Sequence, residues 1–169
     1  MKLFDCSTYF EEDMMMETRF NILNQYVDKF VVCEANFSHS GSKKKINFNK
    51  DNFPKFKKKI IHLILENEPE DLEKNINYDL RVARSNSIKR ISFQRDYIVK
   101  GLKEAHDDDF IMYSDNDEIP DLSKVDFKNN QNEILIFKQK LFYYKFNLIL
   151  DRLDWYGTKC CRKKKLKNI

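Results

Sequence analysis

The sequence predicts an α/β domain with a mostly parallel central sheet. Short apolar runs with the length of buried strands alternate with two segments whose apolar residues recur at helical spacing. Over residues 1–120 the order of these segments is β-α-β-β-α-β, which favours parallel strands joined by crossover helices. The chain has 169 residues, 41% of them hydrophobic, which is enough for a core, and we expect 1–169 to form a single domain.

Three strands and one helix are expected in the first 65 residues. The strands are predicted at residues 2–9, 29–33 and 59–65. A helix is predicted at about 13–27, and its apolar stripe repeats at spacings of four, three and four residues: Met16, Phe20, Leu23 and Val27. Glu17 and Arg19 flank this stripe, so we expect one or both to face outward or into a cleft.

The second strand runs into a carboxylate and a polar loop. Glu34 and Asn36 follow its apolar residues, and the loop at 38–45 is rich in Ser and Lys and contains a Gly. Such a loop can cradle a phosphate with backbone N–H groups and ammonium charge. It lacks the P-loop spacing, however, and this pattern alone slightly favours an ordinary exposed loop.

A second helix is predicted at about residues 82–105, and its apolar face is Ile91, Ile98, Leu102 and Ala105. The tripeptide 94–96 (Gln-Arg-Asp) lies between two of these positions, on the turn that leads toward the next strand. That strand, at 110–113, has the length and residue types of a buried central strand.

Three acidic residues follow the central strand within four positions. Asp115 and Asp117 point to the same side because side chains alternate along an extended chain. Two adjacent carboxylates repel each other unless a cation or a shared proton lies between them. Mg²⁺ and Mn²⁺ take oxygen ligands of this kind, and α/β sheets bind ligands beyond the carboxyl ends of their strands. The stretch therefore indicates a metal site, although a solvated acidic turn would give the same pattern.

The character of the chain changes after Pro120. Two β-like runs rich in aromatic residues are predicted at 134–137 and 141–150. Residues 151–158 are predicted to be a functional loop or turn. Aromatic clusters more often form core than a sugar platform, but Trp155 beside Asp154 in a loop is better evidence for carbohydrate stacking than a Trp in a strand. Residues 159–167 are predicted to be a basic tail that adds no core-forming element.

Composition excludes several classes of protein. The four cysteines lack zinc spacing, and buried free thiols are expected. The chain has no apolar stretch of bilayer length and no signal-type N-terminus, which predicts a soluble, cytoplasmic protein without a transmembrane segment. The net charge is +4, but the basic blocks lack interleaved aromatic residues, which argues against nucleic-acid binding.

Six blocks, spread over nearly the whole chain, resemble the family 17 glycosyltransferases, whose best-known members are β-1,4-mannosyl-glycoprotein N-acetylglucosaminyltransferases. The blocks are 4–5 (Phe-Asp), 17–20 (Glu-Thr-Arg-Phe), 30–38 (Phe-Val-Val-Cys-Glu-Ala-Asn-Phe-Ser), 94–96, 114–120 (Ser-Asp-Asn-Asp-Glu-Ile-Pro) and 155–158 (Trp-Tyr-Gly-Thr). The Val-Cys-Glu-Ala-Asn and Asp-Asn-Asp-Glu-Ile-Pro blocks are specific in this order and spacing, whereas a lone DxD motif is not.

The resemblance implies a GT-A-like (Rossmann-like) nucleotide-sugar-binding fold and inverting transfer of a sugar, GlcNAc, from a UDP-sugar to a glycan acceptor. The implied cofactor is Mn²⁺ or Mg²⁺. By the family's motif, Asp115 lies toward the donor ribose or the metal, and Asp117 coordinates the metal directly. The other positions that match near the nucleotide are implied to bind the donor: Glu34, Asn36, Arg95 and Asp96.

The resemblance divides the chain into a nucleotide-sugar-binding half, 1–120, and the start of an acceptor half, 121–169. Family members generally continue well beyond the Trp-x-Gly-Thr block, which leaves a truncation at the C-terminus open. Inversion needs a general base that takes the proton of the acceptor hydroxyl. Asp151 and Asp154 are the only acidic residues in the aromatic region, and Asp154 is our candidate.

Two alternatives stay open at this point. One is a non-catalytic remnant, which would bind UDP without transferring a sugar. The other is a DxDx-type phosphatase with an aspartyl nucleophile, which is disfavoured because Ile119 stands where such enzymes carry Thr or Val.

Overall fold

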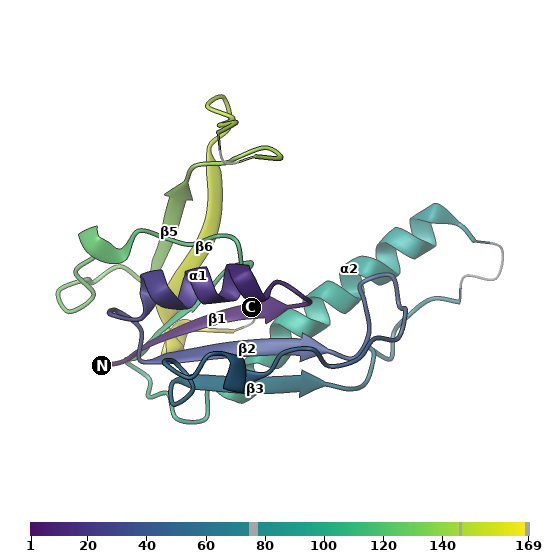
Figure 1. Ribbon diagram of the computed structural model, residues 1–169, viewed down its shortest axis with the longest axis horizontal. Helices are drawn as coiled ribbons and strands as arrows, with labels where there is room; N and C mark the ends of the chain where they lie inside the picture. The colour runs from purple at the N-terminus through teal and green to yellow at the C-terminus, as the bar shows by residue number, and fades with distance from the viewer. Residues whose placement is uncertain (75–77, 146, 168–169) are drawn as a thin grey trace.

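The computed structural model describes residues 1–74, 78–145 and 147–167, and one six-stranded sheet organises these described residues (Figure 1). The strands are β1 (Leu3–Tyr9), β2 (Lys29–Ala35), β3 (Ile60–Leu65), β4 (Phe110–Tyr113), β5 (Ile134–Gln139) and β6 (Trp155–Arg162). The helices are α1 (Asp13–Leu23) and α2 (Leu80–Tyr97), with short 3-10 helices η1 (Lys50–Asn52), η2 (Ile98–Gly101), η3 (Leu122–Lys124) and η4 (Lys163–Lys165).

The strands are arranged in the order β3-β2-β1-β4-β6-β5. The first four strands of the chain are parallel, and β6 pairs antiparallel with both β4 and β5. The chain steps outward from β1 to β2 and β3 and then places β4 on the other side of β1, so the strand order reverses between β1 and β4. The predicted α/β class with a mostly parallel sheet is confirmed, and sheets of this kind bind ligands at such a reversal.

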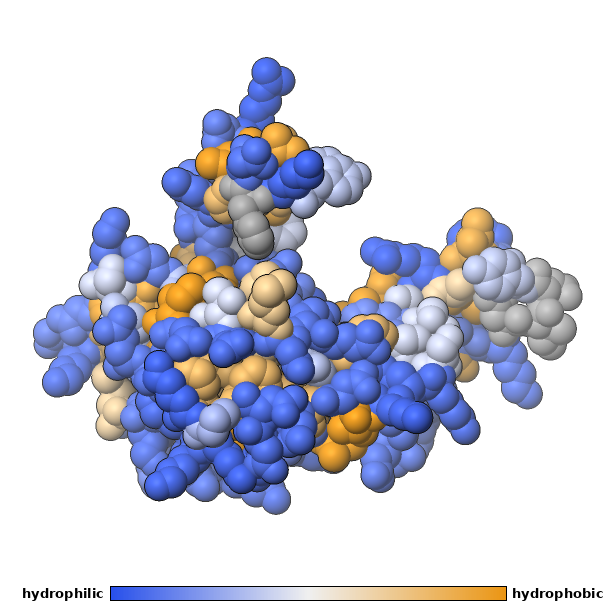
Figure 2. Space-filling model, viewed as in Figure 1, coloured by the Kyte–Doolittle hydropathy of each residue, from blue (hydrophilic) through white to orange (hydrophobic). Residues whose placement is uncertain are grey.

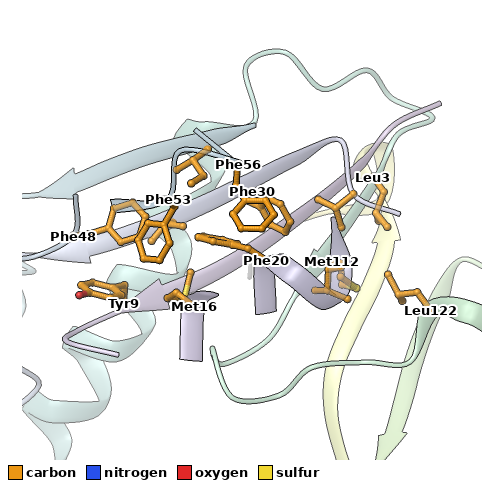
Figure 3. Close-up of a cluster of buried hydrophobic side chains, with 14 of the residues drawn as sticks. Leu3, Tyr9, Met16, Phe20, Phe30, Phe48, Phe53, Phe56, Met112 and Leu122 are labelled. Carbon is orange, nitrogen blue, oxygen red and sulfur yellow. The ribbon is translucent and has the colours of Figure 1, made fainter. Parts of the chain in front are cut away.

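Two apolar clusters cover the two faces of the parallel strands. On one face Phe20 of α1 is central, with its ring centroid 4.6 Å from that of Phe30 and 5.3 Å from that of Phe53 (Figure 3). On the other face, residues 98–105 pack against alternate side chains of the same strands. Because side chains alternate along a strand, Asp5 of β1 points toward the α1 face with its neighbours Leu3 and Tyr9.

Both predicted helices are shorter than expected. α1 ends at Leu23, although Val27 beyond it is still buried in the α1-side cluster. α2 begins at Leu80, where the side chain of Asp79 accepts a hydrogen bond from the backbone N–H of Arg81, and a 3-10 turn replaces it after Tyr97. Its N-terminal part projects away from the sheet (Figure 1).

The predictions for the C-terminal segment were partly wrong. The strand expected at 134–137 is present as β5, but in the described part of 141–150 only an isolated bridge joins Phe142 to Ile149. Residues 155–162, predicted as a loop and a basic tail, form β6. Thr158 and Cys160 are buried at alternate positions of β6, which covers the edge of β4. The clustered basic residues concealed this period of two in the sequence.

The cysteines are free, as expected, and Cys6, Cys33 and Cys160 are buried. Burial raises the pKa of the Cys33 thiol to about 12, so this thiol stays protonated at neutral pH. No helix among residues 1–74, 78–145 and 147–167 is long and apolar enough to cross a membrane.

Replacing Phe20 with Ala should destabilise the domain by about 3–5 kcal/mol, because the change removes a fully buried ring from the α1-side cluster. Ile22 on the same helix is 46% exposed, so Ile22→Ala is the matched control and should cost about 1 kcal/mol or less. Guanidinium unfolding measures both changes. Equal destabilisation by the two variants would contradict this packing.

Candidate active site

A pocket of about 310 Å³ opens at the carboxyl ends of β1, β2 and β4. It therefore lies where the strand order reverses, as expected for a ligand site in an α/β sheet. Arg95 of α2 lines one wall, and Asp115 and Asp117, from the loop after β4, line another. Three of the residues predicted from the sequence thus meet in one pocket.

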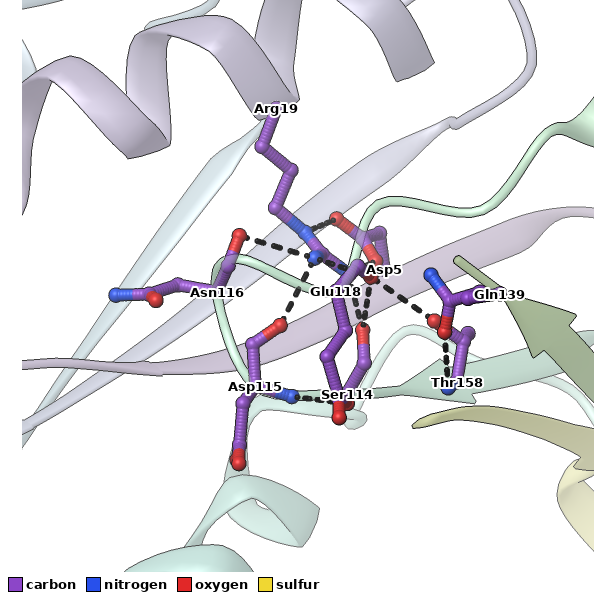
Figure 4. Close-up of polar contacts among 8 residues, drawn as sticks. All are labelled: Asp5, Arg19, Ser114, Asp115, Asn116, Glu118, Gln139 and Thr158. Atoms are coloured by element: carbon purple, nitrogen blue, oxygen red, sulfur yellow. Dashed lines mark hydrogen bonds and ion pairs between the residues drawn. The ribbon is translucent and has the colours of Figure 1, made fainter. Parts of the chain in front are cut away.

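A buried ion pair holds the loop after β4 (Figure 4). Arg19 of α1 donates to both carboxylate oxygens of Asp5 in β1, at 2.7 Å from Nε and 2.6 Å from Nη2. Its Nη2 also donates to Ser114 Oγ at 2.7 Å, and its Nη1 donates to the carbonyl oxygens of Asp115 and Glu118, each at 3.2 Å. One guanidinium thus fixes the backbone on which Asp115 and Asp117 are carried.

The burial of Arg19 was not foreseen. Glu17 is exposed, as expected, but Arg19 is fully buried and turned toward the sheet. Burial alone would lower the pKa of Arg19, but the charge of Asp5 and the hydrogen bonds to it outweigh burial and raise that pKa. Arg19 is therefore a permanent buried cation, which is stable there only because Asp5 and the loop carbonyls surround it.

Asp115 is fixed by side chains from two elements. Arg95 Nη2 donates to Asp115 Oδ1 at 3.0 Å, and its guanidinium lies 5.5 Å from the centroid of the Tyr113 ring. Tyr113 Oη donates to the same oxygen at 3.3 Å, and burial raises the pKa of this phenol, so it stays protonated. The Asp115 side chain is nevertheless 48% exposed and remains open to the pocket.

Asp117 is exposed, and its side chain has no hydrogen-bond or ion-pair partner among the residues that the structure describes. Within that part of the chain, no group of three or more His, Cys, Asp or Glu side chains could hold a metal ion. Mg²⁺ commonly binds through one or two carboxylates and takes its other oxygens from water and substrate phosphates. Asp117, with Asp115 two residues away, fits an ion whose remaining ligands come from water and the substrate.

The other residues predicted to bind the donor do not line this pocket. Glu34 is fully buried and accepts hydrogen bonds from two backbone N–H groups of the loop after β2, at 2.8 and 2.9 Å, and from Lys44 Nζ. These contacts show that Glu34 holds the loop after β2 in place. Asn36 is half-buried, and Asp96 lies on the exposed side of α2. Donor contacts by these three residues stay a prediction.

A second cleft, of about 1210 Å³, adjoins the pocket. It lies between the start of α1, the loop after β4 and an arm that comprises β5, β6 and the described residues between them. Figure 2 shows this arm standing above the body of the molecule, with a wide hollow beside it. Glu12, Asp115 and Asp117 line both the pocket and the cleft, so the two spaces meet at these carboxylates.

Asp154, the predicted general base, lines neither space. It forms an ion pair with Lys138, at 2.7 Å, on the exposed surface of the arm. Its role as the base stays a prediction.

Sequence analysis missed two carboxylates of the site. Glu12 precedes α1, and its Oε2 accepts the backbone N–H groups of Phe10 and Glu11, at 2.9 and 3.1 Å. Glu118 accepts the indole N–H of Trp155 at 2.7 Å and the backbone N–H of Asp115 at 3.1 Å. The available signals were an acidic residue just before a helix and another directly after the DxD motif.

The sheet topology and the position of the pocket define an α/β protein with a pocket at the carboxyl ends of its strands, where proteins of this class bind their ligands. In a comparison with protein families, residues 1–167 match Glycosyltransferase family 17. The chain therefore belongs to glycosyltransferase family 17 and is an enzyme of the glycosyltransferase class, acting on a sugar donor and a glycan acceptor. Comparisons with curated proteins and with solved structures each gave no match. The resemblance seen in the sequence blocks is confirmed.

Replacing Arg19 with Met should destabilise the domain by about 3–5 kcal/mol, because Asp5 would be left buried without its counter-charge. The same change should speed amide hydrogen exchange at residues 114–118, which lose their shared hydrogen-bond donor. Arg81→Met is the control, because Arg81 is 93% exposed in its ion pair with Asp79. Unchanged exchange at 114–118 in the Arg19 variant would refute this role.

Proposed function

We propose that this enzyme is a GT-A-type, metal-dependent, inverting glycosyltransferase that moves GlcNAc from UDP-GlcNAc to a glycan acceptor. The observation that carries the proposal is the pair of carboxylates at the end of β4, in a chain of glycosyltransferase family 17. Asp115 is fixed by Arg95 and Tyr113, while Asp117 is exposed to both spaces. The GlcNAc donor and the inversion come from the family resemblance.

The residues in and around the pocket have different roles in binding the donor. Arg95 is half-buried and charged, and it presents a guanidinium at the wall beside which a diphosphate would lie. Asp117 and Asp115 would hold Mn²⁺ or Mg²⁺, which when bound stabilises the charge on the departing diphosphate. Arg19 keeps these carboxylates in place without touching the donor.

In the transfer step, the oxygen of an acceptor hydroxyl forms a bond to the anomeric carbon of the sugar from the face opposite the diphosphate. The bond from that carbon to the diphosphate breaks, and its electron pair leaves with UDP. The hydroxyl proton passes to a carboxylate of the enzyme. The base must therefore lie where the acceptor approaches the donor. Glu12, Asp115 and Asp117 are the carboxylates that line both the pocket and the adjoining cleft. Because Asp115 and Asp117 are assigned to the donor and the metal, Glu12 is the candidate base that the geometry favours over Asp154.

Replacing Asp117 with Asn should weaken UDP and UDP-GlcNAc binding in Mn²⁺ by about tenfold or more and leave the weak binding in EDTA unchanged. Isothermal titration calorimetry with each nucleotide, with Mn²⁺ and with EDTA, measures this. Asp121→Asn is the matched control, because Asp121 lines the cleft but not the pocket. Absence of UDP binding by the unmodified chain in every condition would refute the proposed donor site, whereas UDP binding without transfer or donor hydrolysis would indicate a remnant.

Replacing Glu12 with Gln should lower kcat by about 10²- to 10⁴-fold and leave UDP affinity unchanged, because the amide oxygen can still accept the two backbone N–H groups but the group can no longer take a proton. Asp154→Asn should have a small effect, since Asp154 is 54% exposed in a surface ion pair. Donor hydrolysis and transfer kinetics measure both variants. If only the Asp154 variant lost most of its kcat, Asp154 and not Glu12 would be the general base.

A further inference from the structure

We infer that the wide cleft beside the donor pocket is the binding site of a neutral oligosaccharide acceptor, with Trp155 as its stacking platform. This inference rests on the proposed function, because it takes the 310 Å³ pocket as the donor site. Beyond the proposed function, the inference states where the acceptor binds, how large it is, what charge it carries and which side chain holds it.

The location follows from the geometry of transfer. The acceptor oxygen must come within about 3–3.5 Å of the donor's anomeric carbon before it reacts. An acceptor can reach the donor only through a space that opens onto the pocket, and the cleft shares three carboxylate residues with the pocket: Glu12, Asp115 and Asp117.

The size of the cleft favours an oligosaccharide over a single sugar. Pockets for drug-sized ligands are about 300–1,000 Å³. The cleft, at about 1210 Å³, exceeds that range, whereas the donor pocket is at its lower end. A chain of several sugar units would fill the space along the arm, and one sugar would leave most of it to water.

Trp155 is held as a rigid platform at the edge of the cleft. It is the single tryptophan of the chain, it is 39% exposed, and its indole N–H donates to Glu118 Oε1 at 2.7 Å. Gly157 makes this contact possible, since a Cβ there would lie 2.6 Å from the Glu118 carboxyl carbon. With its polar edge bound, the indole offers its apolar surface to the C–H groups of a sugar ring at little cost in conformational entropy.

The charge of the cleft favours a neutral ligand. Seven acidic and three basic residues line it. Carboxylates accept hydrogen bonds from sugar hydroxyls, so the acidic lining can bind neutral sugars. The same lining repels uronic acids and other anionic sugars.

Because Trp155 is the single tryptophan, its fluorescence reports directly on the cleft. The chain, saturated with UDP and Mn²⁺, is titrated with neutral tetrasaccharides of mannose, glucose and N-acetylglucosamine, with the three monosaccharides, and with tetragalacturonate. We expect a saturable change in Trp155 emission with at least one neutral tetrasaccharide and binding at least about tenfold weaker for its monosaccharide. Tetragalacturonate should bind more weakly than the neutral chain.

Variants test the platform, with calorimetry as the readout. Trp155→Ala should weaken binding of the tetrasaccharide by about tenfold or more, and Trp155→Phe, which keeps an aromatic face, should weaken it less. Tyr156→Ala is the matched control: Tyr156 is the next residue of β6, is 54% exposed and does not line the cleft. UDP affinity should be the same in all three variants, which shows that the donor site is intact.

The inference and the proposed function fail in different ways. If UDP binds but no tetrasaccharide changes Trp155 emission, the acceptor site is wrong and the donor site stands. Tighter binding of tetragalacturonate, or full tetrasaccharide affinity in Trp155→Ala, also overturns the inference. A saturable tetrasaccharide signal in a chain that does not bind UDP would support the cleft and overturn the donor assignment.

Discussion

The geometry of the site depends on one buried ion pair, between Arg19 of α1 and Asp5 of β1. An isolated buried charge is strongly unfavourable, so the two side chains tie the first helix to the first strand. Arginine has more donors than one carboxylate can accept, and those left over bind the carbonyl groups and the hydroxyl of the loop after β4. Asp115 and Asp117 of that loop are therefore positioned by contacts that Arg19 makes with the loop backbone. The Arg19 contacts do not use the carboxylates of these two residues.

A second buried carboxylate acts in the same way on the neighbouring strand. Glu34 near the end of β2 is fully buried and binds two backbone N–H groups and Lys44 in the loop that follows. His62 of β3 lies 3.6 Å from the same carboxylate, and burial lowers the pKa of this imidazole, which favours its neutral form. Asp5 and Glu34 both point to the α1 side of the sheet, and each fixes a loop near the pocket. Buried charged side chains thus fix the loops around the pocket, while the more exposed Asp115 and Asp117 line the pocket itself.

The sequence was sufficient for the parallel half of the fold, because β1 to β4 are apolar runs of strand length separated by helical periodicity. It was insufficient for β6, where Lys159 and Arg162 belong to a run of basic residues that conceals the alternate burial of Thr158 and Cys160. That burial depends on the edge of β4, which is distant in the sequence. Asp115, Asp117 and Arg95 line one pocket. The two aspartates could be singled out because DxD after a central strand is a local signal, whereas Arg95 was singled out through the family resemblance, and their roles stay predictions. Local signals for Glu12 and Glu118 were weak, because the position of Glu12 depends on the meeting of two cavities and the contact of Glu118 with Trp155 joins residues far apart in the chain. The contact of Arg19 with the loop after β4 is likewise long-range.

The segment 115–118 lines both the pocket and the cleft, and its contacts hold the two spaces in a fixed arrangement. Its backbone is bound on one side by Arg19 and on the other by Thr158 of β6, whose hydroxyl donates to the carbonyl of Glu118 at 2.9 Å. Asp115 lines the pocket, while the Glu118 side chain reaches across Gly157 to Trp155 on the arm. A shift of this segment would displace the carboxylates at the pocket and the aromatic wall of the cleft together. β6 is thus part of the framework of the site, because Thr158 and Trp155 both bind Glu118 in the segment that lies between the pocket and the cleft.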